Sequence, residues 1–521
     1  MRITLLAAAC LASAAVALPA QAADCTIAIG MVMELTGPAG AYGQAGAKAV
    51  DMALRDFNEA GGVNGCKIVA DTRDSQSQGA VAVDQATQLV NIKKVPVIIG
   101  GIISSVSIPI LTSVTAPAGV VQVSPASSSP TLTELARSGK TNGVFFRTIT
   151  SDALQGTAAA KYAIDQGLKK LAIIHVNNDF GVNMVREFKA TYEKLGGTIA
   201  SITPYNEKQS SYTAEANAAM AGDPEALYLV SYPVDGATIA RAWISNGGPQ
   251  KFLLNDGMNS SDFIKAVGAK YLDNAYGTSS GTSETASTDY FNKNFEAFSG
   301  GIKPDAPAAD RSYDAGAIVA LAIAKAGKPE PAAIKAAIRE VVAPDGASIH
   351  AGKEEFAKAL ALIKEGKPIK YEGVIGPISF DQYGDITGPF RLWRIENGEV
   401  KTVGEMSADE VAKIKAQLGK CIHPFSPPCG EKGRPHPAVA AASFFLISPL
   451  SARAPAESSL SAAFSRKLSN PPRCSTERSE AAATRRRTER PSESEISVTL
   501  QRFGKKRVRV LRLEWLTLLP V

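Results

Sequence analysis

The chain has 521 residues, of which 45% are apolar and 20% charged, and this composition is that of a globular protein rather than a disordered or fibrous one. Its formal charge of +6 is unevenly spread, because residues 431–521 hold 17 of the 56 Lys and Arg but only 8 of the 50 Asp and Glu. Residues 1–430 therefore keep 39 basic and 42 acidic residues, a net charge of −3, which argues against nucleic acid as a partner.

The N-terminus predicts an export signal. Arg2 precedes an apolar run that ends in Ala20-Gln21-Ala22, the small-x-small pattern cut by signal peptidase. We therefore expect residues 1–22 to be a signal peptide, and the mature protein to be exported and soluble. An uncleaved anchor and a lipid attachment at Cys10 are the alternatives.

Short apolar runs alternate with helical patterns from Thr26 to about Ser280. The first series has strand-like runs at 27–32, 67–71 and 95–101, and the rhythm restarts at 170–178. Such an alternation is typical of parallel, doubly wound α/β sheets, and the restart predicts two of them. Further along, 376–381 and 390–400 are expected to pair as a hairpin through Tyr383-Gly384-Asp385.

The loops after the strand-like runs are where a ligand is expected, since ligands of open parallel sheets bind beyond the carboxyl ends of the strands. The first loop, 36–44, is rich in glycine and contains Tyr42, whose ring is a candidate wall for a pocket. A turn with a core tyrosine is the alternative.

Two serine-rich loops follow the next runs. One opens a predicted helix at Ser104 and Ser105, and the other spans Ser124 to Pro130. Hydroxyls and free N–H groups at a helix start favour a carboxylate, although an ordinary helix cap fits the same residues.

The second series offers acids at strand ends. Asp179 and Asp256 each follow an apolar run, and Tyr232 precedes Pro233. A carboxylate there is a candidate partner for a ligand ammonium. A helix cap at Asp179 and an exposed turn at Asp256 are the alternatives.

Cysteine positions predict one disulfide. Cys25 and Cys66 open successive strand-like runs, so that their strands, if neighbours, bring them together. Cys421 and Cys429 are candidates for a small loop, and Cys474 has no evident partner. Free thiols are the alternative in each case.

The sequence contains few of the motifs that would indicate an enzyme. The four histidines have no metal-ligand spacing and no P-loop is present. Residues 277–281, Gly-Thr-Ser-Ser-Gly, match the nucleophile-elbow pattern, but a Ser/Thr-rich run follows them instead of a helix, so we interpret them as a flexible loop. No cofactor is expected.

From Cys25 to about Gly419, the sequence resembles the leucine/isoleucine/valine-binding family of periplasmic proteins, the substrate-binding proteins of branched-chain amino acid ABC transporters. The resemblance rests on the order and spacing of short motifs: TGPAGAYG, NEAGGVNG, GGIISS, VSPASSSPTLT, FFRTITSDALQG, HVNNDFG, RSYDAGA and YEGVIGPISFDQYGD.

The resemblance implies a type I periplasmic-binding fold, with two lobes joined by a hinge that close on the ligand. It implies a monomer that hands a small amino acid-like ligand to a membrane permease. We expect lobe 1 to comprise 23–145 and 281–350, and lobe 2 to comprise 146–280 and 351–420. Residues 421–521 are expected to be a disordered extension.

Carried over by position, the resemblance also assigns roles in the site. Ser104 and Ser128 would bind the ligand carboxylate, assisted by the backbone around Ser105 and Ala126, and Asp256 would bind the ammonium. The side-chain pocket would be lined by Tyr42, Phe180 and Tyr232.

Two residues depart from the family pattern, because Asp256 replaces a longer Glu and Phe180 replaces a tyrosine. Urea, short amides and aromatic acids therefore remain alternative ligands, and ligand sensing for a receptor remains an alternative to transport.

Overall fold

The computed structural model describes residues 25–273, 275–420, 502–503 and 506–507. The predicted signal peptide, 1–22, and the loop expected between Cys421 and Cys429 lie outside the described residues. So does the extension 421–521, apart from β16 (Arg502–Phe503) and β17 (Lys506–Arg507), which pair antiparallel. No helix within the described ranges has the length and apolar character needed to cross a membrane.

The first lobe is built on a five-stranded sheet in the order β2-β1-β3-β4-β5, and every pair in it is parallel. The Val and Ile residues of β3 and β4 are wholly buried, as expected of a sheet covered by helices on both faces. The strands are β1 (Thr26–Met33), β2 (Lys67–Asp74), β3 (Val97–Gly100), β4 (Val121–Ser124) and β5 (Phe145–Arg147).

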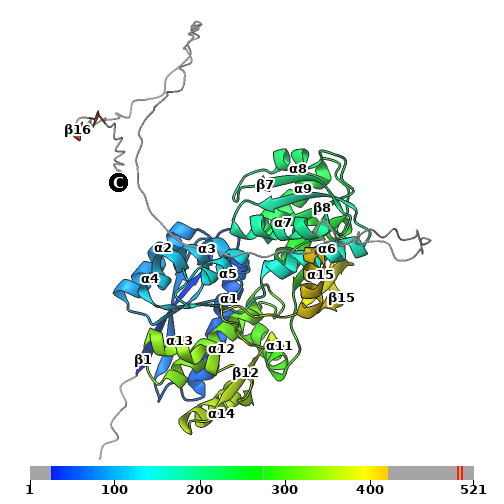
Figure 1. Cartoon of the computed structure of the whole chain (residues 1–521). Helices are drawn as coiled ribbons and strands as arrows, with labels where there is room; N and C mark the ends of the chain where they lie inside the picture. The colour runs from blue at the N-terminus through cyan, green and yellow to red at the C-terminus, as the bar shows by residue number, and fades with distance from the viewer. Residues whose placement is uncertain (1–24, 274, 421–501, 504–505, 508–521) are drawn as a thin grey trace, which may run out of the picture. The chain divides into compact units, whose positions relative to one another are not determined.

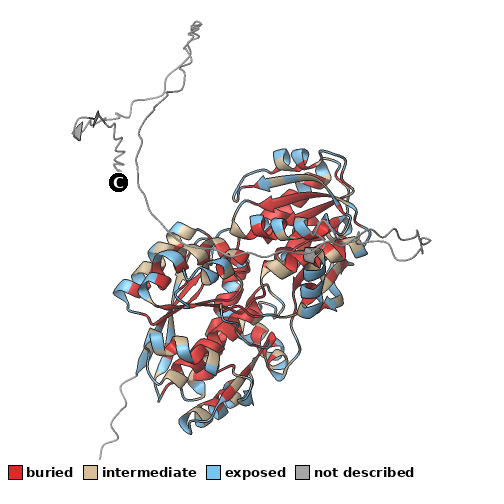
Figure 2. Cartoon of the chain, viewed as in Figure 1, coloured by how far each residue is buried: buried red, intermediate tan, exposed pale blue. Residues whose placement is uncertain are grey.

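Two groups of helices surround this sheet (Figure 1). One group contains α1 (Gly40–Glu59), α11 (Ala286–Ser299), α12 (Ala309–Ala326), α13 (Pro331–Glu340) and α14 (Lys353–Lys364). The other contains α2 (Gly79–Thr87), η1 (Gln88–Ile92), α3 (Ser104–Ile110), η2 (Leu111–Thr115), α4 (Ala116–Ala118) and α5 (Pro130–Arg137). Figure 2 shows that the buried residues lie on the strands and on the helix faces that cover them.

The second lobe is built on a seven-stranded sheet in the order β15-β14-β10-β9-β8-β6-β7. Its pairs are parallel from β7 to β10 and antiparallel beyond β10. The strands are β6 (Lys170–Val176), β7 (Thr198–Tyr205), β8 (Ala226–Val230), β9 (Phe252–Leu254), β10 (Tyr276–Ser280), β14 (Phe390–Glu396) and β15 (Glu399–Met406). The helices are α6 (Asp152–Asp165), α7 (Asp179–Tyr192), α8 (Thr213–Ala219), α9 (Pro233–Ser245), η3 (Asp256–Met258), α10 (Ser261–Val267), η4 (Ala269–Tyr271) and α15 (Ala408–Lys420).

Two sequence interpretations on this sheet were wrong. Residues 277–281 are not a flexible loop, because 276–280 form the buried strand β10. The predicted hairpin is also misplaced: β14 pairs with β15, not with residues 376–381. The turn between β14 and β15 is Asn397-Gly398. Both residues have positive φ (53° and 78°), as a two-residue type I′ hairpin turn requires.

Three chain segments link the lobes. They run from β5 to α6, from β10 to α11, and from the small sheet β11-β12-β13 to β14. This small sheet comprises β11 (Ala347–Ile349), β12 (Ile369–Gly373) and β13 (Gly376–Pro377), and α14 packs on α1 and α12. The expected passage to lobe 2 at residue 351 is therefore too early, because the chain stays with the first lobe until after β13.

The predicted disulfide between Cys25 and Cys66 is confirmed. Thr26 lies opposite Lys67 in the parallel pair of β1 and β2, so the two cysteines meet at the amino ends of these strands. The loops that were expected to bind a ligand follow the opposite ends.

Candidate ligand-binding site

A cavity of about 230 Å³ lies between the two lobes, beyond the carboxyl ends of strands from both sheets. It is smaller than the sites of drug-sized ligands, which start at about 300 Å³. Seven of the eight predicted residues line it, while half-buried Ser105 on α3 does not. The seven are Tyr42, Ser104, Ala126, Ser128, Phe180, Tyr232 and Asp256.

Ser104 lines the cavity, and its hydroxyl proton has no acceptor in the part of the chain that the structure describes. It begins α3, and its Oγ accepts a hydrogen bond from the backbone N–H of Ser129 at 3.1 Å. That bond occupies a lone pair but leaves the hydroxyl hydrogen available. Ser104 is therefore suited to donate to an anionic group.

Ser128 has the opposite polarity. Its Oγ donates to Oδ2 of Asp152 at 3.0 Å, so its proton is already engaged and its lone pairs remain. Burial, together with the nearby charge of Asp256, raises the pKa of Asp152 well above its usual value, so the ionised form that accepts this bond is favoured when a positive charge lies beside Ser128. Ser128 is therefore suited to accept a hydrogen bond from a cationic group.

Asp256 supplies the carboxylate of the second lobe. Its Oδ1 accepts from Asn255 Nδ2 at 3.0 Å and from the N–H of Gly257 at 3.1 Å, and among the described residues its Oδ2 has no hydrogen bond. Burial raises its pKa, opposed by the hydrogen bond from Asn255 and the charge of Arg311. A ligand ammonium would stabilise the ionised form that burial disfavours.

Aromatic and aliphatic side chains form the rest of the wall. The rings of Phe180 and Tyr232 stack with centroids 5.8 Å apart, and the Tyr232 hydroxyl accepts from Asn178 Nδ2 at 3.2 Å. Tyr42 is buried, and Ile102, Ile103 and Ile149 also line the cavity. This part of the wall suits an apolar side chain.

Three of the residues that the sequence interpretation missed are polar side chains that hold or line the site. Asp152 orients Ser128, Asn255 holds Asp256, and Arg311 lines the cavity while donating to the carbonyls of Ser280 at 2.9 Å and Gly281 at 3.2 Å. Asp152 and Arg311 lie within motifs that carried the family resemblance. Their roles depend on partners distant in sequence, so no local pattern identifies them.

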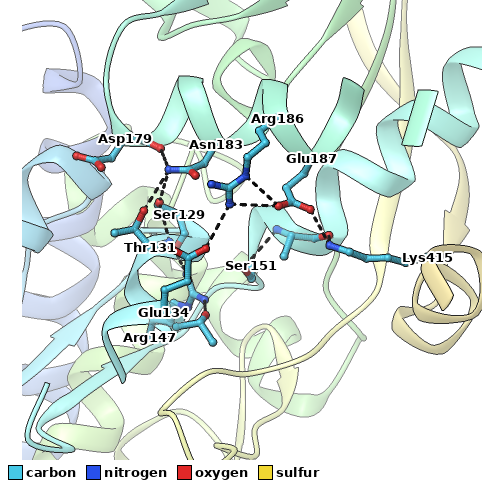
Figure 3. Close-up of polar contacts among 12 residues, drawn as sticks. Ser129, Thr131, Glu134, Arg147, Ser151, Asp179, Asn183, Arg186, Glu187 and Lys415 are labelled. Atoms are coloured by element: carbon cyan, nitrogen blue, oxygen red, sulfur yellow. Dashed lines mark hydrogen bonds and ion pairs between the residues drawn. The ribbon is translucent and has the colours of Figure 1, made fainter. Parts of the chain in front are cut away.

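Polar contacts from α7 join the second lobe to the first (Figure 3). Asn183 on α7 donates through Nδ2 to Ser129 Oγ and Thr131 Oγ1, both at 3.2 Å. On the same helix, Arg186 reaches Glu134 on α5 at 3.4 Å. These contacts bring the second lobe onto the loop that carries Ser128.

A buried acid supports the other serine loop and makes stability depend on pH. Glu34 accepts from the N–H groups of Ile102 at 2.9 Å and Ile103 at 3.2 Å, just before Ser104, and burial raises its pKa to about 7. The folded protein therefore binds this proton more tightly than the unfolded chain, and stability should fall as pH rises from about 4.5 to about 7.

Thermal unfolding across this pH range measures the dependence. Burial also raises the pKa of Glu207 and of Asp314 to about 7, so Glu34→Gln should reduce the slope without removing it. The matched control is Glu284→Gln, which changes an exposed acid and should leave the slope unaltered. If the stability of wild type and of Glu34→Gln fell equally with pH, Glu34 would not contribute to the pH dependence.

The sequence is similar to a family of binding proteins and to individual members of known sequence. A family described as "Periplasmic binding protein" matches residues 26–399. The Leu/Ile/Val-binding protein homolog 3 of Brucella melitensis is 29% identical over 387 residues, covering 73% of this chain and 94% of the relative. The chemotactic signal transduction system substrate-binding protein BasB of Halobacterium salinarum is 25% identical, covering 68% of this chain and 83% of the relative.

Among solved structures, the leucine binding protein LivK of Thermotoga maritima superposes with a TM-score of 0.62 at 22% identity. The match covers 74% of this chain and 99% of LivK. It therefore extends over both lobes.

Proposed function

Because this chain belongs to the periplasmic binding protein family, we propose that it captures an amino acid between its lobes and delivers it to the permease of an ABC importer. The type I periplasmic-binding fold expected from the sequence is confirmed. The observation that carries the proposal is the polarity of the cavity. It sets the Ser104 hydroxyl, whose proton has no partner among the described residues, against the half-buried carboxylate of Asp256.

The head group of the ligand is held by both lobes in this proposal. Ser104 donates to the carboxylate, while Ser128 and Asp256 accept from the ammonium. This differs from the expected role of Ser128 as a carboxylate ligand, because its proton is directed at Asp152. Hydrogen bonds to charged groups are worth about 1.5–3 kcal/mol each, enough to select a zwitterion.

The side chain of the ligand lies against Tyr42, Phe180 and Tyr232. These rings and the neighbouring isoleucines favour an apolar group, so we propose a branched-chain amino acid as the ligand. The names of relatives that bind Leu, Ile and Val support this choice. Lobe closure around the ligand would exclude water and strengthen the contact with Asp256.

Transport without turnover, by an exported monomer in the periplasm, is the use we propose. Ligand sensing is the second candidate, and the relative named as part of a chemotactic signal transduction system is the observation that favours it. Transport and sensing would use the same ligand pocket and differ in the membrane protein that binds the ligand-loaded form. Binding of the closed form to a permease or to a receptor distinguishes them.

A thermal-shift screen of the purified chain tests the ligand class. We expect stabilisation by leucine, isoleucine or valine, because saturation at about 100 times Kd adds roughly 2.7 kcal/mol. Urea, short amides and aromatic acids form the comparison set. Stabilisation by that set alone would contradict the amino acid proposal.

A further inference from the structure

An ion pair lies beneath the loop that carries Ser128. Arg147 ends β5 and is wholly buried, and its Nε donates to Oδ1 of Asp385 at 2.7 Å. Asp385 lies in the third linking segment, 238 residues further along the chain. The pair therefore joins the end of β5, where the first linking segment starts, to the third linking segment.

The guanidinium of Arg147 also holds the serine loop on both sides of Ser128. Its Nη1 donates to the carbonyl of Ser127 and to the carbonyl of Ser129, each at 3.1 Å. Ser128 itself is left free to contact Asp152 and the cavity. One rigid cation thus fixes the two peptide groups that flank a candidate ligand residue.

Thr133 completes the arrangement. Its hydroxyl accepts from Arg147 Nη2 at 2.9 Å and donates to Asp385 Oδ2 at 2.6 Å. The backbone follows the same path, since the N–H of Arg147 donates to the carbonyl of Gly384 at 3.0 Å. All three nitrogens of the guanidinium therefore have partners, and Asp385 uses both carboxylate oxygens.

Stability alone explains such a pair poorly, because the cost of desolvating buried charges often cancels their attraction. A lysine in place of Arg147 would keep the charge but lose the planar fork that reaches the two carbonyls and Asp385 together. The planar guanidinium is therefore what distinguishes arginine from lysine at position 147, and two of its hydrogen bonds go to the loop that carries Ser128.

We propose that Arg147 and Asp385 are positioning residues that fix Ser128 for the ligand and tie its loop to the hinge. The part that concerns the ligand rests on the proposed function. Neither residue lines the cavity, so both act through the loop. In consequence, a change in the third linking segment alters ligand affinity without touching the ligand.

The test compares Arg147→Lys with Arg73→Lys in the ligand-free protein. Arg73 makes a two-contact pair with Asp71 in β2, in the same lobe but at the far edge of its sheet, which provides a chemically matched control. Amide hydrogen exchange is followed at Ser129 and Asp152, whose N–H groups donate to Ser104 Oγ and to the carbonyl of Ser128. We expect about tenfold faster exchange at both amides in Arg147→Lys only.

Ligand affinity gives the second measurement. In Arg147→Lys and Asp385→Asn, L-leucine should bind about tenfold more weakly than in wild type, while Ile68→Val supplies a destabilised core control with wild-type affinity. Ile68 is buried in β2, far from the serine loop in the sheet order. If Arg147→Lys does not fold, Thr133→Val removes the bridging hydroxyl and takes its place in both measurements.

The two measurements separate two kinds of failure. Unchanged exchange at Ser129 and Asp152 would overturn the positioning role, and so would faster exchange with affinity equal to that of Ile68→Val. Absence of binding by wild type to every amino acid would instead overturn the proposed function. The exchange measurement would then still decide whether Arg147 orders the loop.

Discussion

Replacing Asp256 with alanine should weaken amino acid binding roughly 100-fold, or about 2.8 kcal/mol, while the protein stays folded. Asp256 is the acid of the second lobe that lines the cavity with an oxygen free of other hydrogen bonds among the described residues. Without it, the ligand ammonium is buried against Ser128 alone. Titration calorimetry measures the loss.

Two variants sharpen this experiment. Asp256→Asn keeps the shape and removes the charge, so it should lose nearly as much affinity as alanine if the ammonium contact is ionic. Asp273→Ala removes an exposed acid of the same lobe and should bind as wild type does. Wild-type affinity in Asp256→Ala would show that the ammonium lies elsewhere.

Among the substitutions proposed here, removal of the Cys25–Cys66 disulfide should lower the free energy of unfolding most. The bridge closes a loop across 41 positions, for which the chain-entropy model gives about 4 kcal/mol. The double variant Cys25→Ser/Cys66→Ser should therefore unfold at clearly lower denaturant concentration than wild type. Chemical denaturation followed by circular dichroism measures the difference.

Ligand affinity serves as the control for this variant. The bridge joins the amino ends of β1 and β2, whereas the cavity lies beyond the carboxyl ends of the strands. We therefore expect L-leucine to bind the double variant with wild-type affinity. An unchanged unfolding midpoint would contradict the stabilising role, and a loss of affinity would show that the first sheet is distorted throughout.

Much of the fold could be predicted because the signals are local. Buried runs such as those of β3 and β6 alternate with amphipathic helices, and this alternation specifies parallel sheets without any tertiary knowledge. The loops that line the cavity followed from the same rule, since parallel strands carry their ligands at one end. Ser105 does not line the cavity, and the role expected of its backbone stays a prediction.

What the sequence could not show depends on partners far along the chain. The direction of the Ser128 hydroxyl is set by Asp152, and Asp385 faces Arg147 across 238 residues. The misplaced hairpin has the same origin, because Tyr383-Gly384-Asp385 has turn-like residues but serves the third linking segment. The actual turn, Asn397-Gly398, carried the stronger local signal.

Titration of the wild-type protein with L-leucine and two blocked derivatives tests the central claim most directly. N-acetyl-L-leucine lacks the ammonium that Asp256 and Ser128 would accept from, and L-leucinamide lacks the carboxylate that Ser104 would donate to. We predict that L-leucine binds and that each derivative binds at least about 30-fold more weakly, the equivalent of about 2 kcal/mol. Binding of N-acetyl-L-leucine as tightly as L-leucine, or no binding of L-leucine, would contradict the account.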